Sequence, residues 1–457
     1  MKKLTALFLC LMLCLSASSA LAWQWDESEI IPGLHDFGGE TVTIASPYDI
    51  SLEPGLNYET DLLIDRIAQL EENWNVHVKF EQIDATSFWD NMSTTVMSGA
   101  PYGDVMFGFP WYMDGWIAAG AVRDVAPLME ELGYDVHDGS WGRSVIADNT
   151  IGNALYGFSR GYDQIEFALI YNPQVFEDAG LTDPNTIIDE GGVWTLDMLK
   201  DYAKKLTAFD ETGSHTQVGL IVCDLKWTAA CFVLANGGEV VEFDEAGYPS
   251  LGLGSAKALE GLDIFYNMAY NDQSLIASGW DSAVKALLNG TAGMHLCEQW
   301  VLEYIPGYVE DAGIDPNYAL TYFPVGSEEL DYMDVNYGGS CYFIPTSISD
   351  ERAKMALAVY AALYQPTTEM DQEEMLITTA EEFLADEKSV EVYVDIIMNK
   401  PHKSSQFSRV SLFEVYNYMI EDMFYGSTPQ SVINSYQNEV DGILADCAYV
   451  KTLNSQQ

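Results

Sequence analysis

Residues 153–181 read NALYGFSRGYDQIEFALIYNPQVFEDAGL, and this stretch decides how the rest of the chain is interpreted. Two apolar segments, of which the second is β-prone, flank a polar, glycine-containing crossing at residues 159–164. Asn172 and Pro173 end the second segment, because proline lacks an N–H group and restricts the residue before it. A short amphipathic helix follows and ends at Gly180, a common C-terminal residue of helices. The pattern predicts a chain that passes between two lobes.

Composition limits what kind of protein this is. With 457 residues the chain is too long for one small core and long enough to form two lobes. Its hydrophobic content of 48% is ordinary for a globular protein. The 70 acidic residues outnumber the 20 basic ones, and the formal net charge is -50 at pH 7. This charge argues against nucleic acid and anionic membranes as partners, and it suits a solvated extracellular surface with a neutral or cationic ligand.

Residues 1–22 have the physical features of a signal peptide. Lys2 and Lys3 give a charged start, and residues 4–15 form an apolar core that is too short to span a membrane. An Ala-x-Ala cleavage site ends at Ala22. We therefore expect an exported protein, periplasmic or extracellular, that is soluble after cleavage near Ala22.

The cysteines do not form a recognisable framework. Cys10 and Cys14 lie in the leader, and each follows a leucine where a lipobox needs a small residue, so no lipid anchor is expected. An odd number of cysteines remains, which leaves at least one unpaired. They are Cys223, Cys231, Cys297, Cys341 and Cys447. A disulfide between Cys223 and Cys231 stays open, but buried thiols are the favoured interpretation.

The first third of the mature chain alternates strands and helices. Strands are predicted at 40–45, 76–80 and 104–107, and helices at 61–73 and 88–98. This order predicts the start of a parallel α/β sheet. Tyr48 lies in a loop after the first strand, and residues 108–115 are predicted as an aromatic loop after the third. Ligands bind at such strand ends in α/β sheets.

The later segments continue the alternation. A helix is predicted to end at residue 206, with Thr195 as its N-cap. Further strands are predicted at 217–222 and 341–344, and further helices at 226–234, 255–270 and 350–364. We find no internal repeat.

Several short motifs occur in a consistent order along this layout. They are Gly103-Asp104-Val105, the segment 120–125, Tyr156-Gly157, Tyr171-Asn172, Trp194-Thr195, Asn236-Gly237-Gly238 and the segment 289–294. Together they resemble the extracellular solute-binding proteins of ABC importers, in particular the maltose-binding-like family 1. The resemblance covers nearly the whole mature chain. Ser159 departs from it, since the family often has proline there.

The resemblance implies an α/β, two-lobed periplasmic-binding-protein-like fold of type II, with a ligand cleft between lobes that are joined by hinge crossings. Lobe 1 would contain residues 23–160 and 291–337, and lobe 2 residues 161–290 and 338–457. Three glycine-containing crossings, at 159–164, 289–292 and 337–340, would let the lobes close on a ligand by bending about one line.

Aromatic residues are the main candidates for ligand binding. The resemblance implies that Trp227 and Trp300 stack on sugar rings, because aromatic faces suit the apolar C–H surface of a sugar. We expect these two on opposite lobes, and we expect either to be replaceable by alanine with folding largely intact. The other aromatic candidates are Trp111, Tyr112, Tyr48 and Tyr162. A place in the core or at its rim is the alternative for each.

Polar candidates would supply hydrogen bonds to hydroxyl groups. Asp163 and Gln164 belong to the first crossing, and Glu298 and Gln299 follow the predicted strand at 294. Tyr337 and Gly338 open the third crossing and complete the predicted ligand-binding set. A solvated loop face is the alternative interpretation of these residues.

Neither a catalytic residue nor a metal or cofactor is predicted. The chain has no Gly-x-Ser-x-Gly elbow, no His-Glu-x-x-His pair and no Walker pattern. His295 and Cys297 share one face of a strand, but no third ligand is near in sequence and core packing is favoured. The sequence therefore predicts binding without turnover.

The predicted function is the extracytoplasmic substrate-binding component of an ABC importer, which binds a sugar or oligosaccharide and delivers it to a membrane permease by hinge closure. The expected partners are that small-molecule ligand and the permease, with no nucleic acid, and the protein is expected to be a monomer. Two alternatives stay open. One is a polyamine-binding or other cation-binding protein of the same fold, and the other is an exported carbohydrate-active enzyme.

Overall fold

A computed structural model describes residues 36–56, 58–161, 165–313, 316–336, 339–366 and 372–456. The predicted signal peptide lies outside these residues, as do the site candidates Tyr162, Asp163, Gln164, Tyr337 and Gly338. The chain divides into two compact units. Unit 1 comprises Met1–Phe107, Leu128–Asp135 and Ser347–Asp371, and unit 2 comprises Gly108–Pro127, Val136–Thr346 and Gln372–Gln457, each as far as the structure describes it.

Unit 1 begins with the alternation predicted from the sequence. Its elements are β1 (Glu40–Ser46), α2 (Tyr58–Trp74), β2 (Val76–Gln82), α3 (Ala85–Met97), β3 (Val105–Gly108, whose last residue belongs to unit 2), most of α5 (Ala126–Leu132) and α14 (Asp350–Leu363). β1 lies between β2 and β3 and is parallel to both, with Ile44 opposite Phe80 and Val105. The predicted parallel start of the sheet is confirmed.

Both early helices of unit 1 bury one face at helical spacing. The buried face of α3 consists of Phe88, Met92 and Val96, which are four residues apart. Asp84 caps the start of α3 by accepting a hydrogen bond from the Ser87 N–H at 2.9 Å. The helix stops before Gly99, whose φ of 79° is a left-handed conformation that favours glycine.

An arginine fixes α14 to unit 1, although α14 is far away in the sequence. Arg352 donates to Asp104 in a paired arrangement, with Nε to Oδ1 at 2.7 Å and Nη2 to Oδ2 at 2.8 Å. The Thr43 backbone N–H donates to the same carboxylate at 2.9 Å. Such bidentate pairs combine charge with fixed geometry, so they hold the helix in register on the sheet.

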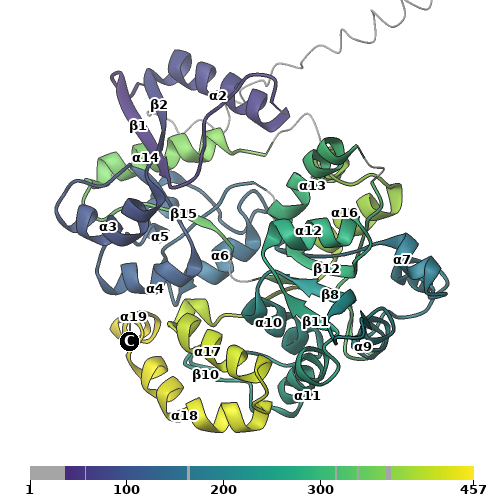
Figure 1. Cartoon of the computed structure of the whole chain (residues 1–457). Helices are drawn as coiled ribbons and strands as arrows, with labels where there is room; N and C mark the ends of the chain where they lie inside the picture. The colour runs from purple at the N-terminus through teal and green to yellow at the C-terminus, as the bar shows by residue number, and fades with distance from the viewer. Residues whose placement is uncertain are drawn as a thin grey trace, which may run out of the picture. The chain divides into compact units, whose positions relative to one another are not determined.

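Unit 2 contains most of the remaining elements (Figure 1). Its helices are α4 (Pro110–Ala118), α6 (Arg143–Asn149), α7 (Pro173–Asp178), α8 (Pro184–Asp189), α9 (Leu196–Lys205), α10 (Leu225–Ala235), α11 (Ala256–Tyr266), α12 (Trp280–Leu288), α13 (Gln299–Ala312), α15 (Gln372–Glu381), α16 (Glu387–Asn399), α17 (Phe413–Phe424), α18 (Pro429–Asp446) and α19 (Ala448–Ser455), with a π-helical turn at Asn267–Asn271 and a 3-10 turn at Ser408–Val410. Its strands are β4 (Thr150–Ile151), β5 (Ala154–Leu155), β6 (Phe167–Tyr171), β7 (Ala208–Phe209), β8 (His215–Val222), β9 (Val241–Phe243), β10 (Pro249–Leu251), β11 (Leu275–Ala277), β12 (Ala292–Glu298), β13 (Ala319–Thr321), β14 (Asp334–Asn336), β15 (Cys341–Phe343) and β16 (His402–Ser404).

The main sheet of unit 2 has the strand order β11-β8-β12-β6-β13. β8 is parallel to both β11 and β12, whereas β6 is antiparallel to β12 and to β13. The carboxyl ends of β8, β11 and β12 therefore meet the amino end of β6 at one edge of the sheet. We call this the carboxyl edge.

Alternate residues of the sheet face two different cores. In β12, Leu296 packs into the larger core with α10 and α11, whereas Cys297 packs into a second core with α13 and α16. In β6, Leu169 and Ile170 divide between the same two cores. Figure 1 shows α12, α13 and α16 on one side of this sheet and α10 and α11 on the other. Both faces are covered, as expected for parallel strands with nearly continuous apolar sequences.

Several expectations from the sequence differ from the structure. Residues 108–115 were expected to form a loop, but α4 begins at Pro110, because proline suits the first helical position. The segment 291–337 is expected in lobe 1, but β12 hydrogen-bonds to β6 and β8 and so lies in unit 2. Of the other predicted lobe 1 residues, 108–127 and 136–160 also lie in unit 2, and the described residues 347–366 of predicted lobe 2 lie in unit 1. The crossing expected at 289–292 is a turn inside unit 2, where the Thr291 N–H donates to Asn289 Oδ1 at 3.0 Å.

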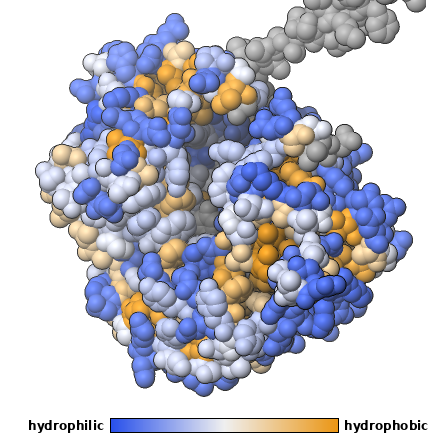
Figure 2. Space-filling view, viewed as in Figure 1, coloured by the Kyte–Doolittle hydropathy of each residue, from blue (hydrophilic) through white to orange (hydrophobic). Residues whose placement is uncertain are grey.

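Figure 2 shows mostly hydrophilic residues on the visible face, with hydrophobic residues in scattered groups. None of the helices within the described ranges combines the length and the apolar character needed to cross a bilayer.

Candidate functional site

The carboxyl edge of the unit 2 sheet is the place where functional side chains gather. α10 starts three residues after β8, and α13 starts directly after β12, so both helices direct their amino-terminal N–H groups to this edge. Asp224 caps α10 by accepting hydrogen bonds from the N–H groups of Lys226 at 3.0 Å and Trp227 at 3.3 Å. The cap therefore places a carboxylate at the carboxyl edge and fixes the start of α10 there.

Six aromatic rings of unit 2 form one connected group near this edge, which we call the edge cluster. They are Phe109, Trp111, Phe167, Trp227, Phe407 and Phe413. Phe109 stacks on Trp111 with ring centroids 4.2 Å apart, and Phe413 stacks on the Trp111 ring at 5.4 Å. Trp227 lies 6.0 Å from Trp111 and stacks on Phe407 at 4.5 Å. Offset and stacked contacts of this kind favour a preformed aromatic surface.

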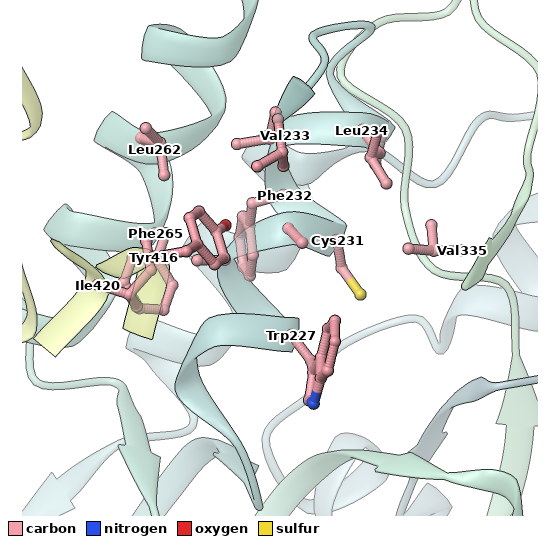
Figure 3. Close-up of a cluster of buried hydrophobic side chains, with 14 of the residues drawn as sticks. Trp227, Cys231, Phe232, Val233, Leu234, Leu262, Phe265, Val335, Tyr416 and Ile420 are labelled. Carbon is pink, nitrogen blue, oxygen red and sulfur yellow. The ribbon is translucent and has the colours of Figure 1, made fainter. Parts of the chain in front are cut away.

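Trp227 is one of the two buried rings of the edge cluster, together with Phe407. It is only 5% exposed and belongs to the larger core. In Figure 3 it lies at one end of a buried hydrophobic group that includes Cys231 and Phe232, and its indole nitrogen points away from the other labelled side chains. Trp227 therefore supports the rings around it, whereas Phe109, Trp111, Phe167 and Phe413 are the half-buried members.

A lysine occupies the aromatic faces of the edge cluster. Lys226 Nζ lies 4.8 Å from the centroid of the Phe413 ring and 5.4 Å from that of Trp227. It also forms an ion pair with Asp224 Oδ2 at 2.5 Å. The Lys226 ammonium thus neutralises the Asp224 carboxylate and takes the position in which a cationic ligand would be attracted to these rings.

Glu298 adds a polar group at the end of β12. Residues of β12 alternate between faces, so Glu298 shares the face of Leu296, which packs with the core that contains Trp227. Its Oε2 atom is buried and has no hydrogen-bond partner among the described residues. Burial raises the pKa of this carboxyl, and the charge of Asp224 adds to the rise. Glu298 is therefore available to hydrogen-bond a ligand hydroxyl.

The segment that carries Phe407 and Phe413 is held by a half-buried histidine, His402. His402 Nδ1 lies 2.9 Å from Asp334 Oδ2, and its Nε2 lies 3.9 Å from Asp148 Oδ2. Burial alone would lower the pKa of the imidazole, but Asp148 and Asp334 outweigh burial and raise it to about 10. The charged His402 thus ties β16 to β14 at neutral pH, just before the chain reaches the edge cluster.

Trp300 lies in a different environment from Trp227, although both follow strands of the same sheet. With Trp280 and Tyr304 it forms a group of solvent-exposed rings, which we call the outer patch. Trp300 is 42% exposed, and its centroid is 5.5 Å from that of Trp280 and 6.0 Å from that of Tyr304. The expectation that Trp227 and Trp300 belong to opposite lobes is wrong for the compact units, since both lie in unit 2.

The structure brings only some of the other candidates together. Tyr112 stacks on Trp116 at 5.5 Å and also lies 6.3 Å from Trp111. Gln299 is buried, where it accepts a hydrogen bond from the Tyr393 hydroxyl at 3.1 Å, so it faces away from the edge cluster. Tyr48 belongs to unit 1, where its half-exposed ring meets Phe107 edge-on at 5.6 Å.

Four members of the edge cluster were not among the candidates. Phe109 and Phe167 lie next to predicted strand ends, which is a signal that could have pointed to them. Phe407 and Phe413 follow β16 near the end of the chain, and no local motif marks them. Only the tertiary fold brings these two rings to Trp227.

The thiols and His295 are structural. All five cysteines after the leader are free, so the open alternative of a Cys223–Cys231 disulfide is not formed. His295 Nδ1 lies 3.0 Å from the carbonyl oxygen of Ile221, and burial lowers the pKa of this imidazole to about 4. Within the described residues, no group of three or more His, Cys, Asp or Glu side chains is arranged to hold a metal ion.

Comparison with protein-family models assigns the chain to a family. The sequence model of the bacterial extracellular solute-binding proteins matches residues 57–369, which is more than half of the chain. The chain belongs to this family. A comparison with curated protein sequences found no match.

Solved structures of solute-binding proteins share the fold. The maltose/maltodextrin-binding domain MalE from Bdellovibrio bacteriovorus, bound to maltotriose, is 14% identical with a TM-score of 0.59, over 89% of this chain and 100% of that one. An ABC transporter solute-binding protein from Thermotoga lettingae, bound to α-D-tagatose, is 17% identical with a TM-score of 0.58 over the same shares. UgpB from Mycobacterium tuberculosis, in complex with glycerophosphocholine, is 14% identical with a TM-score of 0.62, over 88% and 98%. This likeness confirms the predicted two-lobed α/β fold.

Proposed function

We propose that this protein is the extracytoplasmic binding component of an ABC importer and that it binds a neutral sugar or oligosaccharide at the edge cluster. Family membership makes it an extracellular solute-binding protein. The named ligands of the similar structures include maltotriose and tagatose, which are neutral and rich in hydroxyl groups. The proposed partner is a membrane permease that receives the ligand, and the protein is proposed to act as a monomer without nucleic acid.

The position of Lys226 is the observation that carries this proposal. Aromatic faces beside carboxylates could hold either a sugar or a polyamine. In the edge cluster the Lys226 ammonium already lies over Phe413 and Trp227 and pairs with Asp224. An arriving cation would meet a like charge here, whereas a sugar could stack on the half-buried rings and hydrogen-bond to Glu298. The site therefore favours a neutral ligand over the cationic alternative.

Binding without turnover is part of the proposal. A glycosidase needs two carboxylates in defined roles, one as acid and one as base or nucleophile. Asp224 is engaged by Lys226 and by two backbone N–H groups of α10, so it acts as a helix cap. Incubation with oligosaccharides and chromatography of the products tests this, and sustained release of smaller sugars would contradict it.

A binding screen tests the choice of ligand. Ligands that bind only the folded state raise the unfolding temperature by mass action, so a thermal-shift screen can compare sugars, polyamines and amino acids under identical conditions. We expect stabilisation by one or more neutral sugars and none by spermidine or putrescine. Stabilisation by polyamines alone would reject the proposed ligand class and restore the cation-binding alternative.

Delivery of the ligand to the permease by hinge closure of the two lobes is also part of the proposal. Of the first crossing, residues 159–161 lie within the described ranges, and Gly161 has a φ of 112°, which tolerates backbone changes that other residues resist. A ligand shifts such an equilibrium only if it binds the two states unequally. Small-angle scattering with and without a sugar from the screen should show a smaller radius of gyration at saturation. An unchanged radius would reject closure.

A further inference from the structure

A groove of about 630 Å³ lies between α15 and α16 in unit 2. Residues 382–386 join the two helices, and Phe383 of this link meets the Tyr393 ring of α16 edge-on at 5.6 Å, so the helices form a packed hairpin. Half of the described residues that line the groove carry carboxylates, and none of them is a lysine, an arginine or a histidine. We call it the acidic groove. Its carboxylates belong to Glu373, Glu381, Asp386, Glu387, Glu391 and Asp395.

The spacing of the lining residues places one stripe of each helix in the acidic groove. On α15 the stripe consists of Glu373, Ile377 and Glu381, which are four residues apart. On α16 it includes Val390 and Val394, with a glutamate or an aspartate directly after each. The apolar members pack with the second core, whereas both glutamates of the α15 stripe are exposed. The groove therefore has an apolar floor and a negatively charged rim.

The protein neutralises the charge of this rim only in part. Lys388 Nζ pairs with Glu391 at 3.3 Å, but it lies closer, at 2.7 Å, to Asp189 outside the groove. Lys400 Nζ pairs with Asp395 at 3.3 Å. Three rim carboxylates have no hydrogen-bond or ion-pair partner within the described part of the chain, and they belong to Glu373, Glu381 and Glu387. Carboxylates that gather in one groove create a negative potential, so the rim attracts cationic groups.

The distribution of the carboxylates favours an extended partner over a single ion. A metal ion needs several ligands that converge on one point, and the described residues contain no such group. The lining residues instead follow α15 from Glu373 to Glu381 and α16 from Glu387 to Asn399. At the rise of an α-helix these spans are about 12 and 18 Å long, which is the length of a helix of roughly 8–12 residues.

The acidic groove is separate from the edge cluster. None of the described residues that line the groove belongs to that cluster. In Figure 1, α16 lies on the opposite side of the unit 2 sheet from α10, which carries Trp227. A partner could therefore occupy the groove without displacing a ligand from the edge cluster.

We propose that the acidic groove is a docking site for a basic amphipathic helix of a partner protein. The apolar stripe of this helix lies on the floor, and lysine or arginine residues on both sides of the stripe pair with the rim carboxylates. The floor consists of Ile377, Leu384, Val390 and Val394. The inference goes beyond the proposed function, because it assigns a protein partner to a surface apart from the proposed sugar site.

Binding of synthetic peptides tests the docking site. The probe is a fluorescently labelled peptide of about 14 leucine and lysine residues, with the leucines at positions i, i+3, i+4 and i+7 of a helix. One control peptide has serine in place of leucine and keeps the charge, and the other has glutamate in place of lysine and keeps the apolar stripe. Anisotropy titrations at about 0.15 M salt should give a Kd for the probe that is about tenfold or more lower than for either control.

Two triple variants with the same change in net charge separate the groove from the acidic surface as a whole. The groove variant has glutamine in place of the three unpartnered rim glutamates, Glu373, Glu381 and Glu387. The control variant has glutamine in place of three exposed glutamates on other helices, Glu72, Glu130 and Glu439. The Kd of the probe should rise about tenfold in the groove variant, the combined scale of three partly exposed ion pairs, and stay within about twofold of wild type in the control variant.

A change in the floor tests the apolar half of the proposal. Ile377 is half-buried and packs against the second core, so Ile377→Ser removes apolar contact area without changing the charge. The Kd of the probe should rise about threefold or more. Thermal unfolding of each variant establishes that it is folded.

Three results would overturn the inference. Equal losses of affinity in the groove variant and the control variant would mean that the peptide binds the acidic surface as a whole. Equal affinities of the leucine–lysine peptide and its serine counterpart would mean that the apolar floor takes no part. Absence of binding by the leucine–lysine peptide to the wild-type protein would reject the docking site.

Discussion

The edge cluster and the outer patch use the same residue types at the same edge of one sheet, yet they differ in what surrounds the rings. In the edge cluster Trp227 is covered by other rings and by an ammonium group. In the outer patch Trp300 contacts only a few rings and is 42% exposed. The comparison shows that an aromatic residue after a strand of this sheet can be packed into the core, as Trp227 is, or exposed to solvent, as Trp300 is.

The largest expected effect is the loss of stability on removing Trp227 from the edge cluster. Trp227→Ala should lower the free energy of unfolding by about 3–5 kcal/mol, since a buried indole leaves a cavity among packed rings, and it should abolish sugar binding. Because Trp227 is 5% exposed, this prediction replaces the expectation from the sequence that Trp227 can be lost with folding intact. Urea denaturation and calorimetry measure the two effects, and an unchanged unfolding free energy would show that the edge cluster does not stabilise the fold.

Trp300→Ala should separate binding from folding. The free energy of binding should weaken by about 1–3 kcal/mol, the scale of burying one aromatic-sized apolar face. The unfolding free energy should change by less than about 0.5 kcal/mol, as for most surface substitutions. The same two measurements apply. Equal losses of stability in Trp227→Ala and Trp300→Ala would remove the distinction between the two groups of rings.

The pH dependence of stability should report on the edge cluster, because His402 holds the segment that carries Phe407 and Phe413. The pKa of His402 is raised from its usual 6.5 to about 10. Its stabilising contribution is therefore complete below about pH 6.5 and is lost as the pH rises through about 10. Between these values the unfolding free energy of the wild-type protein should fall by about 1–2 kcal/mol more than that of His402→Asn. Parallel pH profiles of the two proteins would reject the role of this ion pair.

The smallest expected effect concerns the polar group between the two sets of rings. Glu298→Gln keeps the shape of the side chain and a hydrogen-bonding oxygen, so sugar binding should weaken by about 1 kcal/mol or less. Spermidine binding should stay absent. A much larger loss of sugar affinity, measured by calorimetry, would mean that the carboxylate has a role that an amide cannot replace.

Local physical chemistry explains which parts of the fold could be predicted from the sequence. The alternation of residues 40–45 and 76–80 predicted β1 and β2 together with their parallel pairing. Thr195 caps α9 as expected, by accepting a hydrogen bond from the Met198 N–H at 3.3 Å. These features depend on neighbours in the chain, so the sequence alone was sufficient.

The remaining features depend on residues that are far apart in the chain. Residues 108–115 contain glycines and aromatics that suit a loop, but burial of Met113 and Trp116 makes them part of a helix. The pairing of β12 with β8 decides that Trp300 belongs to unit 2, and no property of residues 291–300 themselves could show this. The same holds for Phe407 and Phe413, which acquire their role only by contact with Trp227.

The edge cluster also has a consequence for how the protein matures. Its rings come from chain positions as far apart as Phe109 and Phe413, so it cannot form until almost the whole chain is available. Contacts of such long sequence separation form slowly, because the loops between them must first be ordered. A chain that emerges from the export machinery amino terminus first would therefore acquire its strands and their helices well before it could bind a ligand. A ligand that binds at the edge cluster could therefore favour only the last step of folding. A chain that ends before α17 would fold in part but would lack Phe413 and a complete edge cluster.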